Sequence, residues 1–335
     1  MKKQLLFLSM LVLSVSSYSQ SADTEFKPSG NVHFKVFWNY HTDFSENADK
    51  TSAFELKRSY LGYKYAFSKN ISANVTLDVS DNDAGSAYTV LLKTAQLDWK
   101  VSPSVKLSMG LIGMKQFKDQ EDFWGYRYIM KSFQDQYGFG SSADLGINAE
   151  FKLNKNLKAN FIVFNGEGYK EIQDADGQQK VGGSLIFNPV EGLTTKIYMD
   201  SQPAADSDAI GTLSLFAGYK ASKWRIGAEY NMLSNGEKYS KPAQDHDLDG
   251  LSFYSTYVIS KKVEVFGRFD QLSSNTLSGD AEAWNMAKDG NQIVAGIQVA
   301  PVKGLKFSLN YQGFSFEDDA ITNNSLVFLN AEFKL

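Results

Sequence analysis

Apolar and polar residues alternate with a period of two along almost the whole chain, from Gly30 to the last residue. In the segment 145–153 the odd positions hold leucine, isoleucine, alanine and phenylalanine, and the even positions hold glycine, asparagine, glutamate and lysine. The segments 71–80 and 305–312 show the same alternation. Because successive side chains of a β-strand point to opposite faces, this pattern predicts strands with one apolar and one polar face.

The connections between these segments alternate between two lengths. The short ones lie at 69–70, 102–104, 154–156, 189–192, 221–223, 261–262 and 301–304. The long ones lie at roughly 43–52, 82–88, 118–140, 166–179, 202–210, 234–248, 273–289 and 316–323. Seven short and eight long connections join sixteen strands and leave both ends of the chain on the short-turn side. This layout is that of an outer-membrane barrel, which has short periplasmic turns and longer extracellular loops.

The sequence therefore predicts an all-β fold, a transmembrane antiparallel β-barrel of about sixteen strands. The predicted strands are 30–41, 53–67, 71–82, 89–101, 104–117, 141–153, 156–165, 180–189, 192–202, 210–220, 223–233, 249–260, 262–272, 290–300, 304–315 and 324–335. Most have 10–15 residues, whereas about 9–11 tilted residues suffice to cross the apolar layer of a membrane. The last strand alternates to Leu335 and is expected to close the barrel against the first, so that no strand edge is left in lipid.

A secreted β-sandwich or β-solenoid is the alternative to a membrane barrel. Soluble sandwiches favour strands of about 5–6 residues, which is half the length predicted for this chain. The predicted outer face also carries little charge, and a Lys or Arg at the bilayer midplane would cost about 2–4 kcal/mol. Its exceptions are Glu55, Lys57, Lys93 and Lys115, which lie toward the loop ends of their strands. Both features favour the barrel.

The start of the chain has the pattern of an export signal. Two lysines precede an apolar run that is too short for a lasting membrane helix, and small residues follow it. We expect cleavage after Ser19, or after Gln20 as the alternative. Residues 1–19 are then a signal peptide, residues 20–29 a periplasmic tail and residues 30–335 the barrel.

Composition excludes several other classes of protein. The chain has 335 residues, a net charge of −4 and no cysteine. Without cysteine there is no disulfide scaffold and no thiolate metal site, and we expect no cofactor. The mild acidity gives no reason to expect nucleic acid as a partner. The expected partners are outer-membrane lipid, lipopolysaccharide and small hydrophilic solutes or anions.

Three segments carry a recognisable pattern: Phe-Glu-Leu-Lys-Arg-Ser-Tyr-Leu-Gly at 54–62, Leu-Ser-Met-Gly-Leu-Ile-Gly-Met-Lys at 107–115 and Phe-Asn-Gly-Glu-Gly at 164–168. They resemble the phosphate-selective porin O and P family, in the divergent form found in Bacteroidetes-like genomes. The resemblance implies a sixteen-stranded channel, usually a homotrimer, with its third loop folded into the lumen. The chain departs from the phosphate-specific members in being poor in arginine, so the resemblance supports the architecture more than a phosphate specificity.

The longest connection, 118–140, is the candidate constriction. Sixteen strands enclose a channel too wide for side chains to fill, and this loop carries seven aromatic residues, too many for a solvated surface loop. We expect it to fold inward, to pack its rings on the barrel wall and to present Arg127 and Lys131 to the pore, with Tyr126 and Tyr128 beside them. The alternatives are a lid over the mouth or a contact with a neighbouring subunit. Basic residues on the lumen side of the strands complete the predicted pore lining: Lys35, Arg58, Lys64, Lys106, Arg225 and Arg268.

The expected function is passive diffusion of small hydrophilic solutes or ions through an outer-membrane porin, with an anion or phosphate preference left open. A structural or adhesion barrel that does not conduct is the alternative. An outer-membrane hydrolase is a more remote one, because the chain has three histidines and no serine in a Gly-x-Ser-x-Gly context. Asp245, Asp247 and Asp249 resemble the start of a calcium loop, but Thr256 occupies the position of its closing acidic residue, so a full EF-hand is excluded. A partial calcium site formed by the three aspartates is the alternative to an acidic turn before the next strand.

Overall fold

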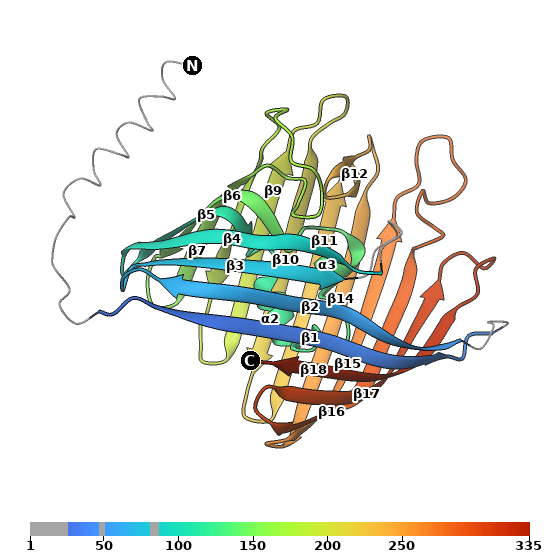
Figure 1. The fold of residues 1–335 in the computed structure, drawn as a ribbon. Helices are drawn as coiled ribbons and strands as arrows, with labels where there is room; N and C mark the ends of the chain where they lie inside the picture. Colours follow the sequence, from blue (N-terminus) through green and yellow to red (C-terminus); the bar gives the residue numbers. More distant parts are fainter. Residues whose placement is uncertain (1–25, 47–50, 81–86) are drawn as a thin grey trace.

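The computed structural model describes residues 26–46, 51–80 and 87–335. The predicted signal peptide and residues 20–25 of the predicted tail lie outside the described residues. In the described part, sixteen long strands form one closed antiparallel barrel (Figure 1). Each strand pairs with its neighbours in the chain, and the last strand pairs with the first from Lys35–Lys334 to Asp43–Leu326. The predicted fold class is confirmed.

The sixteen barrel strands agree with the predicted segments to within a few residues at most ends. They are β1 Ser29–Asp43, β2 Ser52–Ala66, β3 Ile71–Ser80, β4 Thr89–Ser102, β5 Val105–Gly113, β6 Ala143–Lys152, β7 Leu157–Phe164, β8 Lys180–Phe187, β9 Leu193–Gln202, β10 Ile210–Lys220, β11 Trp224–Ser234, β14 Leu248–Ser260, β15 Val263–Ser274, β16 Gly290–Val302, β17 Leu305–Phe316 and β18 Asn324–Lys334. A hairpin of β12 (Gly236–Lys238) and β13 (Lys241–Pro242) forms a separate small sheet inside a connection that we expected to be a loop.

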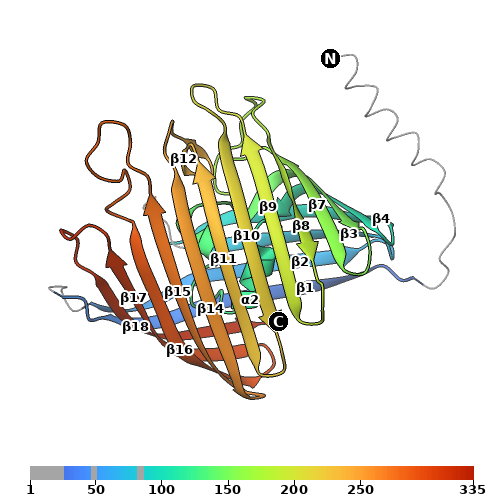
Figure 2. The same ribbon diagram turned by 180° about the vertical axis from the view of Figure 1, so that it is seen from behind.

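The connection between β5 and β6 contains two short helices, α2 (Lys118–Trp124) and α3 (Phe133–Tyr137), which lie inside the ring of strands in both views of the barrel (Figures 1 and 2). Each helix ends at a glycine with a left-handed backbone, Gly125 (φ 78°) and Gly138 (φ 80°), a conformation that a side chain would strain. No helix in the described residues is long and apolar enough to cross a membrane.

The exterior of the barrel is apolar and its interior is polar. Leu309, Ile293 and Leu329 are exposed on the outside, whereas Asn310 and Asn330 are buried inside and hydrogen-bonded to each other at 2.7 Å. A band of exposed leucine, isoleucine and phenylalanine around a whole molecule has no partner layer within the same chain. Such an exterior is suited to hydrocarbon, where a closed barrel leaves no backbone group unpaired.

This exterior leads to a stability prediction. Ile297 lies in the middle of β16 and its side chain is exposed on the outer face. Ile297→Arg should lower the free energy of unfolding from lipid vesicles by about 2–4 kcal/mol, because the guanidinium would sit in hydrocarbon. Ile297→Leu is the control and should unfold like the natural chain. Equal stability of the two variants would contradict a lipid-facing position.

Two β-bulges move residues from the face that simple alternation assigns to them. In the β1–β2 pair Phe37 is opposite Arg58 and Trp38 is opposite Leu56, so Lys57 is an extra residue. Glu55, which we expected on the outer face, consequently lies inside the barrel, 3.5 Å from the His41 ring. In the β3–β4 pair the extra residue is Lys93, between residues paired with Thr76 and Leu77. The Lys93 ammonium also lies inside, 2.8 Å from the Ser142 hydroxyl. Both outer-face assignments were wrong.

Candidate functional site

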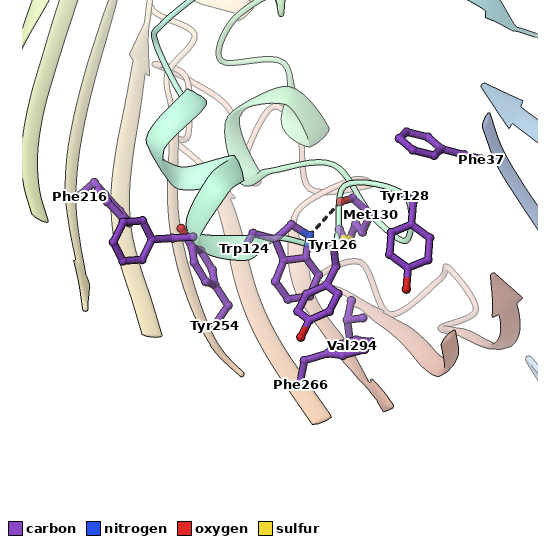
Figure 3. Close-up of a cluster of buried hydrophobic side chains, with 10 residues drawn as sticks. Phe37, Trp124, Tyr126, Tyr128, Met130, Phe216, Tyr254, Phe266 and Val294 are labelled. Carbon is purple, nitrogen blue, oxygen red and sulfur yellow. Dashed lines mark hydrogen bonds between the residues drawn. The ribbon is translucent and has the colours of Figure 1, made fainter. Parts of the chain in front are cut away.

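The inward-folded loop 118–140 is attached to the wall mainly through its aromatic rings. Trp124 is 1% exposed and packs edge-on against Tyr254 and Phe266, with ring centroids 5.9 and 5.8 Å apart. Tyr126 stacks on Phe266 at 4.1 Å and donates a hydrogen bond to the Glu264 carboxylate at 2.8 Å. Figure 3 shows this cluster, in which the Trp124 indole also donates to the Met130 carbonyl. The rings are therefore buried against the wall, and neither a lid over the mouth nor a subunit contact describes this loop.

A buried ion pair fixes the far side of the same loop. Arg268 of β15 donates two hydrogen bonds to the Asp270 carboxylate, at 2.7 and 2.6 Å, and both side chains are fully buried. The same guanidinium donates to the backbone carbonyl of Lys131 at 2.6 Å and lies over the Trp124 ring at 5.1 Å. Arg268, which we expected to line the pore, is therefore placed beneath the loop and holds it.

The tip of the loop reaches across the lumen to β1. Tyr128 donates a hydrogen bond to Gln298 of β16 at 3.0 Å, and its ring centroid lies 6.4 Å from that of Phe37 on β1. In Figure 3, Phe37 lies beyond Tyr128, on the side of the loop away from Phe216 and Tyr254. Phe37 in turn meets Tyr60 of β2 edge-on at 5.9 Å. The loop therefore spans the barrel from β15 and β16 to β1.

Beside the loop lies a cavity of about 970 Å³, lined by residues of the loop, the barrel strands and several long connections. Seven basic and four acidic residues line it among those the structure describes. Arg58, Arg127 and Lys131, three of the predicted pore residues, are brought together here. The cavity wall thus carries an excess of positive charge.

The two arginines of the cavity already have acidic partners. Arg58 lies 2.6 Å from the Asp78 carboxylate, which also accepts a hydrogen bond from the Tyr169 hydroxyl at 2.6 Å. Arg127 lies 3.1 Å from the Asp135 carboxylate. These pairs fix the side chains in place and largely neutralise them, so the arginines are not the source of the unbalanced charge.

Five lysines of the cavity form no ion pair with the residues that the structure describes: Lys131, Lys170, Lys238, Lys241 and Lys288. Of these, Lys131 and Lys170 both interact electrostatically with Arg58 and Arg127. Neither ammonium makes a hydrogen bond or an ion pair with the residues that the structure describes. Burial lowers the pKa of Lys131, and the positive charges of Arg127, Arg58 and Lys170 lower it further, against the opposing effect of Asp135. Burial and the charge of Arg58 lower the pKa of Lys170 in the same way. Two ammonium groups that repel neighbouring cations and lack a partner are suited to attract an anion.

Two lysines of this region could not be found from the alternation. Lys93 is brought inward by its bulge, and its ammonium lies 4.4 Å from the centre of the Tyr169 ring and 4.0 Å from the Asp78 carboxylate. Lys170 belongs to the long connection after β7, where the alternation of a strand is absent and cannot tell which way a side chain points. The segment 164–168, just before it, was part of the family resemblance and was the available signal for the importance of this connection.

The remaining predicted pore residues lie apart from the cavity. Lys106 is in contact with Asp98 at 3.1 Å and with Glu150 at 3.3 Å, and Arg225 donates to the Trp124 carbonyl at 3.3 Å. Lys35 lies on β1 with its ammonium 5.9 Å from the centre of the Phe37 ring, and Lys64 is exposed near the other end of β2. They do not form one site with Lys131.

The predicted calcium ligands do not come together. Asp249 accepts a hydrogen bond from the Tyr230 hydroxyl at 2.7 Å, and Asp247 accepts one from the Asn235 amide at 3.1 Å. Over residues 26–46, 51–80 and 87–335, a set of acidic oxygens close enough to share an ion occurs only in the connection after β7, and not at Asp245, Asp247 and Asp249. This geometry gives no support to a calcium site in the loop before β14.

Comparison with solved structures shows the same fold. The chain is similar to OmpF of Salmonella typhi in complex with daunomycin, with a TM-score of 0.70, 11% identity and coverage of 91% of this chain and 97% of the other. It is similar to an anion-selective porin from Comamonas acidovorans (TM-score 0.67, 12% identity, coverage 92% and 100%). It is also similar to OprB of Pseudomonas putida at high pH (TM-score 0.69, 9% identity, coverage 91% and 94%). The fold is therefore that of the outer-membrane porins.

At the level of sequence, no protein-family model matches the chain and no curated protein matches it.

Proposed function

We propose that this chain is an outer-membrane porin that passes small hydrophilic solutes and favours anions. The observation that carries the anion preference is the set of unpaired lysines in the cavity beside the inward loop, among them Lys131 of that loop and Lys170. A permeating anion there gains attraction from both lysines, whereas a cation meets an excess of positive charge. Fixed charges that line a narrow passage set its selectivity in this way.

The finer parts of the proposal rest on sequence and resemblance. The export signal at residues 1–19 and the apolar exterior support a place in the outer membrane, in contact with lipid and lipopolysaccharide. The resemblance to the phosphate-selective porin O and P family supports a homotrimer. It supports phosphate specificity less well, because the arginines near the loop are occupied by carboxylates or by backbone carbonyls. We therefore propose a general preference for small anions.

Planar lipid bilayers test the proposal. The purified chain should produce discrete conductance steps, and a potassium chloride gradient should give a zero-current potential whose sign reports chloride as the more permeant ion. A chain that inserts without conducting would instead support a structural or adhesion barrel. If phosphate blocks the chloride current at concentrations at which sulfate does not, the channel is specific for phosphate rather than for small anions in general.

The lowered pKa of Lys131 gives a prediction for pH. A lysine carries its charge below its pKa, so a lowered pKa means that the charge is lost at a lower pH than the 10.5 of an ordinary lysine. The anion preference should therefore fall as pH rises from neutral toward 10.5, ahead of the loss expected for an ordinary lysine. Lys131→Arg should weaken this pH dependence, because a guanidinium stays charged throughout that range.

Either of two results would contradict this pH dependence. If the zero-current potential of the natural chain is constant over that pH range, or if Lys131→Arg changes with pH as much as the natural chain does, Lys131 is not the titrating group that sets selectivity.

A further inference from the structure

The lumen contains an apolar patch where a water-filled channel would be expected to be polar. In β17 the inward positions run from Ser308 and Asn310 to Phe314 and Phe316. In β18 the inward positions Leu326 and Phe328 lie beside outward-facing apolar residues, so this stretch of the strand is apolar on both faces. We define the lumen patch as Phe314, Phe316, Leu326 and Phe328.

The residues of the lumen patch adjoin one another across two neighbouring strands, β17 and β18. The rings of Phe314 and Phe316 are in contact, with centroids 4.7 Å apart. Leu326 is opposite Gln312 and Asn324 is opposite Phe314 in the β17–β18 pair, which puts Leu326 diagonally beside Phe314. Phe328 continues the patch to β1, where its ring lies 5.4 Å from that of His41. The patch is continuous.

The inward loop does not explain the lumen patch. The buried aromatic clusters that hold this loop, drawn in part in Figure 3, do not include the four residues, each of which keeps partial solvent exposure. Elsewhere inside the barrel, polar side chains bond to each other, such as Ser308 and Asn310 at 3.3 Å. Apolar rings that face water without serving the packing leave a surface for a solute to cover.

Phe314 and Phe316 line the same cavity as Lys131 and Lys170. One wall of the cavity therefore offers flat apolar rings, and other residues offer ammonium groups without partners, those of Lys131 and Lys170 among them. From this arrangement we infer that the cavity binds small organic anions with an apolar ring, such as aromatic carboxylates. The carboxylate contacts Lys131 or Lys170, and the ring packs on Phe314 and Phe316. This inference rests on the proposed function and narrows its class of solute.

The rings and the ammonium groups of the cavity each argue against one class of solute that would use only the other. Neutral sugars also pack on aromatic rings, but they gain little from unpaired ammonium groups. Inorganic anions use the ammonium groups, but they gain nothing from phenylalanine. Only a solute with both parts uses both surfaces, and offset or edge-on ring contacts favour an aromatic one.

Binding can be measured by the block of chloride current in planar bilayers with three probes. Benzoate carries both the ring and the charge, acetate carries the charge alone, and benzyl alcohol carries the ring alone. Benzoate should block at a concentration about fivefold or more below that of acetate, in line with the extra energy of ring contacts. Benzyl alcohol should block least.

Variants separate the role of the rings from that of the charges. Phe314→Leu with Phe316→Leu keeps an apolar wall and should weaken benzoate block about fivefold while leaving acetate unchanged. Phe307→Leu is the matched control, because it lies on the same strand with its ring exposed on the outer face. Phe314→Ala with Phe316→Ala should weaken benzoate at least as much and gives a second measurement if either pair folds poorly.

The outcomes distinguish this inference from the function on which it rests. If the natural chain favours chloride but benzoate and acetate block its current at equal concentrations, the inference is overturned and the proposed function stands. A block by benzoate that the Phe314 and Phe316 variants do not change also overturns it. If the chain shows no anion preference, the proposed function fails, and this inference fails with the function on which it rests.

Discussion

Replacing Lys131 and Lys170 together by glutamate should convert the anion preference of the channel into a cation preference. The cavity would then be lined by five basic and six acidic residues in place of seven and four. Charges about 4 Å apart interact by about 1 kcal/mol in bulk water and by about 4 kcal/mol near a protein surface. The ratio of chloride to potassium permeability should therefore fall by about tenfold or more. The zero-current potential in a potassium chloride gradient measures it.

A control with the same change in net charge makes this result specific. Lys262 and Lys303 are exposed in short turns and do not line the cavity. Lys262→Glu with Lys303→Glu should leave the sign of the zero-current potential unchanged. If both double variants shift it equally, the total charge of the barrel controls selectivity, and the position of Lys131 and Lys170 does not.

Arg268→Ala should release the inward loop and destabilise the barrel. The change removes the donor to the Lys131 carbonyl and leaves the Asp270 carboxylate, which is 0% exposed, without its cation. Breaking a buried pair from one side costs about 3–5 kcal/mol. The free energy of unfolding should fall by this order, and single-channel conductance should rise because the loop no longer holds its place across the lumen.

A double variant separates charge from anchoring. Arg268→Met with Asp270→Asn removes both charges and should unfold closer to the natural chain, because no unpaired ion is left buried. Its conductance should still rise, because the donor to the loop carbonyl is absent. An unchanged conductance in both variants would show that the aromatic contacts of Trp124 and Tyr126 hold the loop without Arg268.

The strands and their order could be predicted because alternation and connection length are properties of the local sequence. All sixteen strands follow from them. The inward loop could also be predicted, because seven aromatic residues in one connection need a wall on which to pack. The bulges could not be predicted. A period of two has no place for an extra residue, so Glu55 and Lys93 were assigned to the wrong face.

The candidate site was predicted only in part, because alternation gives the face of a residue but not what covers it. Arg268 does face inward, yet the loop that it anchors buries it. Arg58 and Arg127 face the cavity, but their charge is compensated by carboxylates that are distant in sequence. One signal was available and was not used. The four consecutive apolar residues at 326–329 break the alternation where the lumen patch lies.

Modification of one introduced cysteine in a conducting channel tests the central claim, that permeating ions pass Lys131 and respond to its charge. The chain has no cysteine, so Lys131→Cys gives a single reactive thiol. A positively charged methanethiosulfonate reagent should restore the anion preference that this variant loses, and a negatively charged one should shift the zero-current potential toward cations. If the thiol reacts with both reagents and the potential does not change, the passage of ions does not depend on this site and the account is contradicted.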